Sequence, residues 1–306
     1  MKEKSMLKIK KIGLVVKHHQ PEAAQLAFEI CAFLTQKNRE LFFADETTSL
    51  ARELKRKLKR QDPKIKIVPK TKLVDHCDLI LVLGGDGTYL SAARLMKNRS
   101  VPIMGINMGR LGFLTEFNRT EAFEHLRLIL EGTPLLIQER ALLEVKLVRK
   151  NKVIFSSPVV NDAVISKGAI ARIIGMEIWV NDSWVSPIRA DGMIVSTPTG
   201  ATAYALAAGG PLVEPNLPAI VLAPICPHSL TLRPMVLSDT SEVRICLNDR
   251  PGHVLLTLDG QDAIDMKEGD VVKIQKLKKH PLKLVTSPSH DYFNLLREKL
   301  KFGVRD

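Results

Sequence analysis

The stretch Leu79-Ile80-Leu81-Val82-Leu83-Gly84-Gly85-Asp86-Gly87-Thr88 decides the fold. Its unbroken apolar run predicts a strand that is buried on both faces, and the glycines after it predict a tight turn. The spacing of apolar residues over 89–96 predicts that an amphipathic helix follows. Glycines beside a helix N-terminus let backbone N–H groups approach a phosphate, and the helix dipole favours negative charge there.

Asp86 is the unexpected residue of this turn, because its carboxylate would repel a phosphate bound to the neighbouring N–H groups. A carboxylate here suits a proton acceptor for a hydroxyl that attacks phosphorus, or a metal ligand beside phosphates. The structural alternative is an Asp-Gly turn whose carboxylate caps the helix. The stretch matches neither common nucleotide-binding loop, since it lacks the Gly-Lys-Ser/Thr ending and Leu90 replaces the third glycine of G-x-G-x-x-G.

The first part of the chain alternates strand and helix patterns. It predicts strands at residues 12–16, 41–44, 65–68, 79–83 and 101–106, and helices opening at Pro21 and over 47–59 and 121–130. This alternation predicts a parallel sheet with helices on both faces, whose ligands lie at the carboxyl ends of the strands. A glycine-spaced loop over residues 105–113, which carries Arg110, follows a strand at that same edge. We therefore expect this loop beside Asp86.

The pattern changes near residues 135–140 to an alternation with period two. It predicts strands at 143–147, 176–180, 243–247, 254–258, 271–274 and 282–285, with a hairpin turn at 181–183. Such short strands predict a β-sandwich or a related meander. A terminal helix is predicted over 291–300, with Phe293, Leu296 and Leu300 on one face. The predicted domains are an α/β domain (1–138), a β-sandwich (139–286) and a C-terminal helix that returns to the first domain (287–306).

The composition is that of an ordinary globular protein: 306 residues, of which 45% are hydrophobic and 25% charged. The net charge of +12 has two possible causes, solvated Lys/Arg surfaces or an anionic partner. Because only 5% of residues are aromatic, we expect no nucleic-acid partner. The apolar run at 12–16 is too short for a signal peptide, and residues 1–5 show no structural pattern. No run has the length of a membrane span, so a cytoplasmic protein without membrane contact is expected.

The four cysteines, Cys31, Cys77, Cys226 and Cys246, form no C-x-x-C pair. Each lies in an apolar context, which predicts buried, reduced thiols. The histidines have no metal-ligand spacing, so the sequence predicts neither a metal site nor a catalytic histidine.

A second cluster of polar residues lies in the β-rich half. Over residues 189–211 the pattern predicts a strand, then a polar turn, then a helix of small residues that starts with hydroxyls. Such a segment could admit a planar ligand and bind its hydroxyl or phosphate groups. The alternative is a helix capped by Thr199 or Thr202. Asn161-Asp162 offers an amide and a carboxylate for a base edge or a ribose, or forms a β-turn. Asp259-Gly260-Gln261 predicts a hairpin turn.

Together these motifs resemble those of NAD kinases, and they occur in the same order: Gly84-Gly85-Asp86-Gly87-Thr88, Asn161-Asp162, the block from Asp191 to Tyr204, Pro224-Ile225-Cys226-Pro227-His228-Ser229-Leu230, Asp259-Gly260-Gln261 and Asp291-Tyr292-Phe293-Asn294. The resemblance covers essentially the whole chain. Its Thr-Pro-Thr-Gly-x-Thr-Ala-Tyr block is highly specific, whereas Gly-Gly-Asp-Gly is shared with diacylglycerol-type lipid kinases and phosphofructokinases. Two positions depart from the family: Asp162 replaces a frequent glutamate, and Ala201 a frequent serine.

The resemblance implies transfer of the γ-phosphoryl group of ATP to the 2′-hydroxyl of the adenosine ribose of NAD. It implies a site between the α/β and β-sandwich domains, with Asp86 as general base and Gly87 beside it. Mg²⁺ would arrive with ATP, and the enzyme would be a homo-oligomer, a dimer or a tetramer. The other residues implied to bind NAD are Asn161, Asp162, Arg172, Arg189, Asp191, Thr202, Ala203, Tyr204, Ala205, Leu206, Ala207 and Gln261.

Two other functions remain open at this point. A lipid kinase could use the same glycine turn, with the basic surface on an anionic membrane. A non-catalytic dinucleotide sensor could bind NAD without phosphorylating it.

Overall fold

The computed structural model of the chain describes residues 2–5, 7–57, 64–96, 99–109, 111–168, 172–249, 252–288 and 291–303. Tertiary contacts divide the chain into two compact units, residues 1–139 with 282–306, and residues 140–281. The end of the helix predicted over 47–59 and the predicted loop residue Arg110 lie outside the described residues. Within the described part, no helix is both long enough and apolar enough to cross a membrane.

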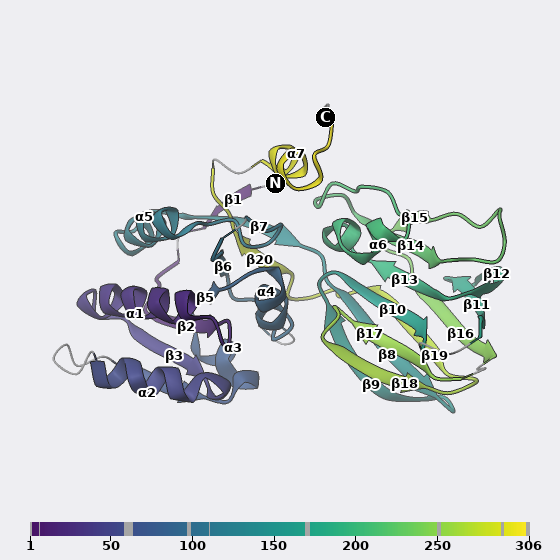
Figure 1. Ribbon diagram of the computed structural model, residues 1–306, viewed down its shortest axis with the longest axis horizontal. Helices are drawn as coiled ribbons and strands as arrows, with labels where there is room; N and C mark the ends of the chain where they lie inside the picture. The colour runs from purple at the N-terminus through teal and green to yellow at the C-terminus, as the bar shows by residue number, and fades with distance from the viewer. Residues whose placement is uncertain are drawn as a thin grey trace. The chain divides into compact units, whose positions relative to one another are not determined.

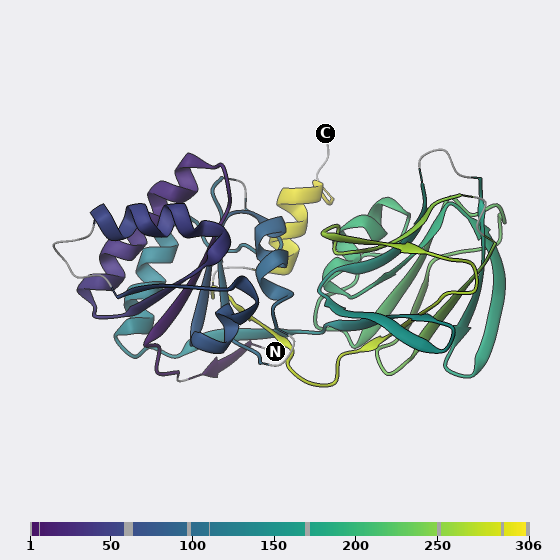
Figure 2. The same ribbon diagram turned by 90° about the horizontal axis from the view of Figure 1, so that it is seen from below.

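The first unit combines a mainly parallel sheet with helices (Figures 1 and 2). Its elements are β1 (Lys2–Ser5), β2 (Lys11–Val16), α1 (Pro21–Gln36), β3 (Glu40–Ala44), η1 (Asp45–Thr47), α2 (Thr48–Lys57), β4 (Ile65–Val68), η3 (Lys70–Lys72), α3 (Leu73–His76), β5 (Leu79–Leu83), α4 (Asp86–Ala93), β6 (Ile103–Ile106), α5 (Arg119–Leu130), β7 (Leu135–Arg140), β20 (Leu282–Val285) and α7 (Tyr292–Leu300). Among the described residues, eight strands form one sheet in the order β1-β7-β20-β6-β5-β2-β3-β4. The strands from β20 to β4 pair in parallel, and β1 is antiparallel to β7.

Helices cover both faces of this sheet, as predicted. The central strand β5 is fully buried, and its Leu79, Leu81 and Leu83 pack in one core with apolar residues of α1 and α5. The opposite face is covered by α3 and α4. There the backbone of Gly105 in β6 lies so close to α4 that a Cβ would stand 2.8 Å from the Tyr89 ring. The unbroken apolar run of β5 is explained by this two-sided burial.

The second unit is a β-sandwich, which confirms the predicted fold class. Its elements are β8 (Leu143–Arg149), β9 (Lys152–Val159), β10 (Asp162–Lys167), β11 (Ile174–Val180), β12 (Ser183–Ala190), β13 (Gly192–Ser196), η4 (Thr199–Thr202), α6 (Tyr204–Ala207), β14 (Ala219–Ile225), β15 (Met235–Ser238), β16 (Val243–Asp249), β17 (Val254–Leu258), β18 (Asp262–Met266) and β19 (Val271–Lys276). The described strands form two antiparallel sheets, in the orders β15-β14-β13-β10-β17-β18 and β12-β11-β16-β19-β8-β9. Alternate apolar residues of both sheets share one core.

Two expectations about strands are wrong. Residues 2–5, predicted to lack structure, form β1, which pairs with β7 from Lys2 and Gln138 to Ser5 and Leu135. The strand at 282–285 was predicted in the sandwich, whose domain was to end at 286. It instead pairs in parallel with β6, so that the second unit ends at residue 281. A strand of four residues, here Leu282-Lys283-Leu284-Val285, fits many sheets, and its pattern does not specify a partner strand.

Three further expectations differ from the structure. Helix α4 begins at Asp86 rather than at residue 89, because Gly85 in extended conformation takes the N-cap position. In α7 only Leu296 of the predicted apolar face is buried, while Phe293 and Leu300 are 56% and 37% exposed. All four cysteines are free, but Cys226 is exposed and only Cys31 and Cys77 are buried. Helix α7 falls within the first unit by its contacts.

Candidate functional site

Asp86 lies in the first turn of α4, directly after the carboxyl end of β5. Its carboxylate does not cap the helix. Oδ2 accepts from the backbone N–H of Phe113 at 2.9 Å, and Oδ1 accepts from the N–H groups of Leu114 and Thr115 at 3.1 and 3.2 Å. The Thr115 hydroxyl donates a further bond to Oδ1 at 3.2 Å. The capping alternative is therefore wrong, and the predicted proximity of the loop at 105–113 is confirmed.

The four hydrogen bonds are distributed unequally over the carboxylate. Because Oδ1 accepts three of them and Oδ2 only one, Oδ2 keeps a lone pair for another donor. The loop comes so close that a Cβ on Gly112 would lie 2.1 Å from Oδ1, a position only glycine can occupy. Gly87 is exposed, and a Cβ there would meet no atom within 4 Å. The half-buried carboxylate thus has a fixed orientation and open space beside it. Sequence reasoning missed Thr115, which belongs to no polar motif.

The second unit carries a groove of about 330 Å³ along the outer face of β10. Four residues predicted to bind a ligand line it, namely Asn161, Asp162, Ala203 and Tyr204. The remaining lining residues are Val164, Ser166, Thr257, Asp259 and Gly260. The residues that sequence reasoning placed on two separate motifs therefore lie around one concave surface.

Asp259 organises one end of this groove from the turn between β17 and β18. Its Oδ1 accepts from the N–H groups of Asn161 and Asp162 at 2.7 and 3.1 Å, and its Oδ2 accepts from that of Val160 at 2.9 Å. The predicted hairpin turn is present, with positive φ at Asp259 and Gly260. The carboxylate has a structural task, because it satisfies three backbone donors where β9 gives way to β10.

Asp162 begins β10 and is 5% exposed. Burial, followed by the nearby Asp259 carboxylate, raises the pKa of Asp162 to about 7. Taking a carboxylate out of water disfavours its charged form, and a second negative charge adds to that effect. Asp162 can therefore change its charge near neutral pH.

The polar turn before η4 is held by Thr197. Its hydroxyl donates to the Val160 carbonyl at 2.5 Å and accepts from the Gly200 N–H at 3.0 Å. Neither Thr199 nor Thr202 provides the helix cap that the structural alternative predicted. A Cβ on Gly200 would stand 2.2 Å from the Asn161 carbonyl oxygen, so glycine lets this turn pack against Asn161. Sequence reasoning missed the role of Thr197, although it lies within the quoted block.

Three predicted residues lie toward the other end of β10. Asp191 forms an ion pair with Lys167 at 2.8 Å. Arg189 is exposed near the end of β12, and Arg172 is exposed just before β11. Lys167 is the last residue of β10 and Asp162 the first, so the Lys167–Asp191 ion pair lies roughly 17 Å along the strand from Asp162. None of the three lines the groove, although Ser166 at its far end pairs with Gly192, next to Asp191.

The other predicted residues surround the groove without lining it. The Thr202 hydroxyl donates to the Thr199 carbonyl at 3.3 Å, and Ala205 is buried in a small core under α6. Leu206 is half-buried and Ala207 is exposed, both in α6. Gln261 is exposed at the end of the β17–β18 turn.

Comparison with known proteins identifies the family. Residues 12–133 match the ATP-NAD kinase N-terminal domain and residues 160–287 the ATP-NAD kinase C-terminal domain. The chain is 42% identical to an NAD kinase of Geobacter metallireducens and 44% identical to one of Geobacter sulfurreducens, in each case over 97% of this chain and all of the relative. A crystal structure of yeast NADH kinase complexed with NADH matches 97% of this chain and 89% of its own, with 25% identity and a TM-score of 0.88. The chain belongs to the ATP-NAD kinase family.

Proposed function

We infer that the chain is an NAD kinase, a phosphotransferase that uses ATP to phosphorylate NAD and yields NADP and ADP. The observation that carries this inference is the match over nearly the whole chain, at 42–44% identity, to proteins of that name. Both the α/β half and the β-sandwich half match their own domain of the family.

In our proposal Asp86 acts as the general base on the 2′-hydroxyl of the adenosine ribose of NAD. The hydroxyl donates to Oδ2, which has accepted only the Phe113 N–H. As the 2′-oxygen forms a bond to the γ-phosphorus, its proton passes to the carboxylate. The bond from the γ-phosphorus to the β–γ bridging oxygen breaks, and ADP leaves with that electron pair. A ribose hydroxyl is a weak nucleophile at neutral pH, so such a base contributes roughly 10²–10⁴-fold to the rate.

We propose that the acceptor binds to the β-sandwich unit, residues 140–281, and in particular to the groove along β10. Its carboxylate and amide, from Asp162 and Asn161, would contact adenine or ribose groups, and Ala203 and Tyr204 would lie against a planar ring. Gly87, Arg172, Arg189, Asp191, Thr202, Ala205, Leu206, Ala207 and Gln261 complete the proposed set. The two arginines can each hold an anionic group of the dinucleotide through paired N–H donors.

Mg²⁺ is proposed to enter as part of the ATP substrate. No three His, Cys, Asp or Glu side chains in the described part of the chain come together as a metal site. Bound to the triphosphate, Mg²⁺ would neutralise the charge that develops during phosphoryl transfer. A homo-oligomeric state, dimer or tetramer, and a cytoplasmic location are likewise proposed.

A coupled assay of the purified protein with NAD, ATP and Mg²⁺ tests the proposed function directly. We expect NADP to form in proportion to the ATP consumed. Phosphorylation of diacylglycerol but not of NAD would instead indicate a lipid kinase. NAD binding without NADP formation would indicate a dinucleotide sensor, and either result would overturn the proposal.

A further inference from the structure

Glu116 is a buried carboxylate that the proposed mechanism does not use. Only 7% of its surface is exposed, and it directly follows Thr115, the last of the three residues whose N–H groups bind Asp86. Its Oε2 accepts from the Thr286 hydroxyl at 2.5 Å and from the Ser287 N–H at 3.3 Å. A carboxylate is costly to bury without donors, and these two bonds offset part of that cost.

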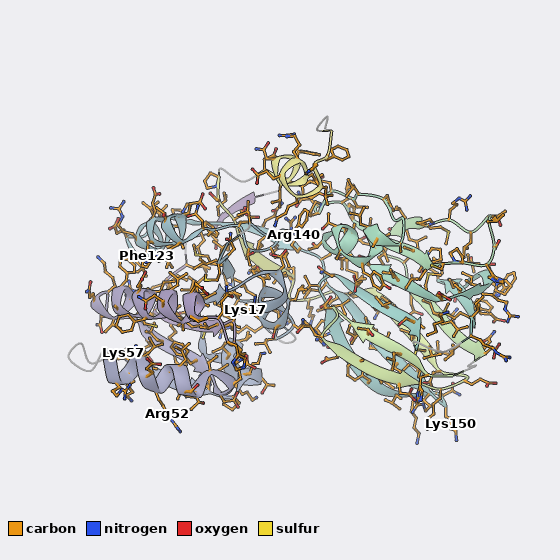
Figure 3. The ribbon with its side chains drawn as sticks, in the orientation of Figure 1. Lys17, Arg52, Lys57, Phe123, Arg140 and Lys150 are labelled. Atoms are coloured by element: carbon orange, nitrogen blue, oxygen red, sulfur yellow. The ribbon has the colours of Figure 1, made fainter. Side chains whose placement is uncertain are left out.

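The two donors directly follow the strand by which the chain returns to the first unit. The chain leaves this unit at the end of β7, which ends at Arg140, and comes back at the start of β20 (Figures 1 and 3). The two strands are neighbours in the sheet, and just beyond β20 the Thr286 N–H donates to the Leu136 carbonyl of β7 at 2.9 Å. Glu116 is therefore attached to a buried part of the sheet that lies 170 positions away in the sequence.

The backbone of the same loop is held by β6. The Phe117 N–H donates to the Gly105 carbonyl at 3.1 Å, and the Asn107 N–H donates to the Phe117 carbonyl at 2.9 Å. The Asn107 side chain donates to the carbonyls of Thr115 and Phe117, at 3.4 and 3.3 Å. Both neighbours of Glu116 are thus held by β6 and by the residue after it, whereas its own side chain is held from the end of β20.

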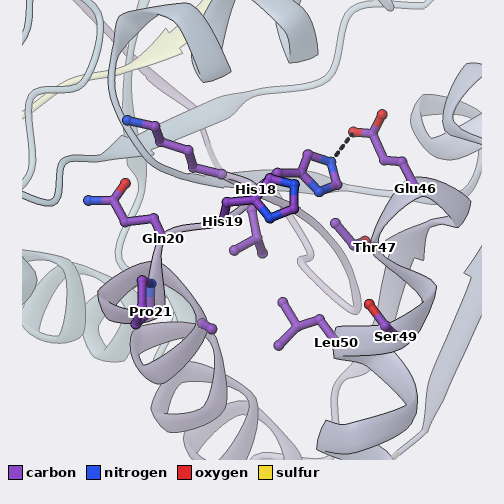
Figure 4. A pocket seen from close by; sticks show the side chains of 11 residues that line it. His18, His19, Gln20, Pro21, Glu46, Thr47, Ser49 and Leu50 are labelled. Atoms are coloured by element: carbon purple, nitrogen blue, oxygen red, sulfur yellow. Dashed lines mark ion pairs between the residues drawn. The ribbon is translucent and has the colours of Figure 1, made fainter.

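Glu116 and Thr286 are placed to act on the loop and not on a ligand. The first unit contains a cavity of about 450 Å³ beyond the carboxyl end of β2, between the start of α1 and the segment from η1 to α2 (Figure 4). Neither residue lines this cavity, and neither lines the groove along β10. Because both side chains are buried and bonded to each other, a change in either should affect turnover without a loss of substrate affinity.

We propose that Glu116 is a positioning residue for the phosphoryl transfer, because it holds the loop whose N–H groups orient the Asp86 carboxylate. The proposal rests on the proposed function, in which Asp86 accepts the proton of the 2′-hydroxyl. A base contributes fully only when its accepting oxygen lies within hydrogen-bond reach of that proton. Without the Thr286 hydroxyl, the backbone at residues 113–115 gains freedom, and Oδ2 of Asp86 spends less time in the productive orientation. Apolar side chains would fill the same space at a similar stability, so the polar contact is best explained by the geometry that it fixes.

Thr286→Val tests the proposal, since valine is nearly the size of threonine but has no hydroxyl to donate to Glu116. We expect kcat to fall about tenfold, with KM for NAD and for ATP within about twofold of the wild type. Thr286→Ser keeps the hydroxyl and should restore the wild-type kcat. The matched control is Thr35→Val. The half-buried Thr35 hydroxyl donates to the Cys31 carbonyl within α1 at 2.7 Å, so this variant also loses a hydroxyl bond but should keep kcat.

A double variant shows whether the effect passes through Asp86. In the Asp86→Asn background no carboxylate remains to be oriented, so Thr286→Val should lower kcat by less than about twofold there. An equal fall in both backgrounds would overturn the proposal. An unchanged kcat of the folded Thr286→Val variant, or a loss confined to KM, would overturn it as well.

Hydrogen exchange of the backbone amides separates this proposal from the proposed function. In the substrate-free protein, exchange at residues 111–117, measured by mass spectrometry, should be faster in Thr286→Val than in the wild type and unchanged in Thr35→Val. Unchanged exchange in Thr286→Val would overturn the positioning role, whether or not NADP is formed. If the wild type forms no NADP but exchange is faster in Thr286→Val, the proposed function is wrong and the role of Glu116 in holding the loop is supported.

Discussion

Thr115 binds the Asp86 carboxylate twice, because its backbone N–H and its hydroxyl both donate to Oδ1 at 3.2 Å. The two residues are 29 positions apart, and the contact fixes the plane of the carboxylate. It leaves Oδ2 with one partner, the Phe113 N–H. The orientation of the proposed base therefore depends on a loop rather than on the helix that carries it.

The Thr115 hydroxyl is expected to matter for turnover more than for substrate binding. Thr115→Val removes the hydroxyl bond but keeps the size of the side chain and the N–H bond. We expect kcat to fall several-fold with KM for NAD unchanged, and the free energy of unfolding to fall by about 0.5–1.5 kcal/mol. Thr115→Ser keeps the hydroxyl, so it should retain the wild-type kcat and the wild-type free energy of unfolding. Equal kcat values for the Val and Ser variants would contradict a positioning role.

The raised pKa of Asp162 predicts a pH dependence of NAD binding. If the carboxylate accepts from the amino group of adenine, it must be ionised, so KM for NAD should rise as the pH falls below about 7. Asp162→Asn should remove that dependence. The range from pH 6 to 8 spans roughly one unit on either side of this pKa. A wild-type KM for NAD that stays constant over this range would argue against a contact between the Asp162 carboxylate and adenine.

The same shift predicts a change in stability with a definite sign. A carboxyl whose pKa is higher in the folded state stabilises the fold below its unfolded pKa, and this contribution is lost as the pH rises through about 7. We therefore compare the melting temperature of Asp162→Asn with that of the wild type. The variant's advantage should be larger at pH 8 than at pH 5. The matched control is Asp182→Asn, in an exposed hairpin turn. Its melting temperature should differ from that of the wild type by the same amount at pH 5 and at pH 8.

Gly200 is predicted to be required for stability and for NAD binding, because it lets the polar turn at residues 197–200 pack against Asn161. Gly200→Ala places a Cβ against the Asn161 carbonyl oxygen, so the turn or Asn161 must move. We expect a loss of about 1–3 kcal/mol in the free energy of unfolding and a higher KM for NAD. Gly109→Ala is the control, since a Cβ there meets nothing within 4 Å. If Gly200→Ala and Gly109→Ala have equal free energies of unfolding, the close packing of Gly200 on Asn161 does not matter for stability.

Arg189 is predicted to influence the choice between NAD and NADH. It is exposed near the end of β12, one residue before Ala190 and two before Asp191. Arg189→Gly removes a positive charge, so the ratio of kcat/KM for NAD to that for NADH should change. Arg189→Lys, which keeps the charge, should change it less. If the ratio is the same in the wild type and both variants, Arg189 has no part in this preference.

Sequence patterns predicted the fold well where local periodicity and burial agree. The apolar run of β5 required burial on both faces, and the alternation in β8 and β11 required one buried face. The strands β1 and β20 were misjudged because four residues carry too little pattern to select a partner strand. The start of α4 was misjudged because glycines beside an aspartate are typical of both a turn and a helix N-terminus.

The candidate site was only partly predictable for a related reason. Asn161, Asp162, Ala203 and Tyr204 stood out as polar or small residues in specific motifs, and the structure brings them to one groove. The supporting contacts were not visible, because Thr115 reaches Asp86 only through the folding of a loop. The same holds for Asp259, which looked like an ordinary turn residue until its three N–H partners came together.

The most direct measurement is the turnover of Asp86→Asn with saturating NAD, ATP and Mg²⁺, beside the affinity of the same variant for NAD. An amide oxygen cannot take up the ribose proton as a carboxylate does, so we predict a fall in kcat of roughly 10²–10⁴-fold with NAD binding largely retained. A circular dichroism melt shows whether the variant keeps its fold despite the altered contacts to residues 113–115. A folded Asp86→Asn variant with near-wild-type kcat would contradict the account.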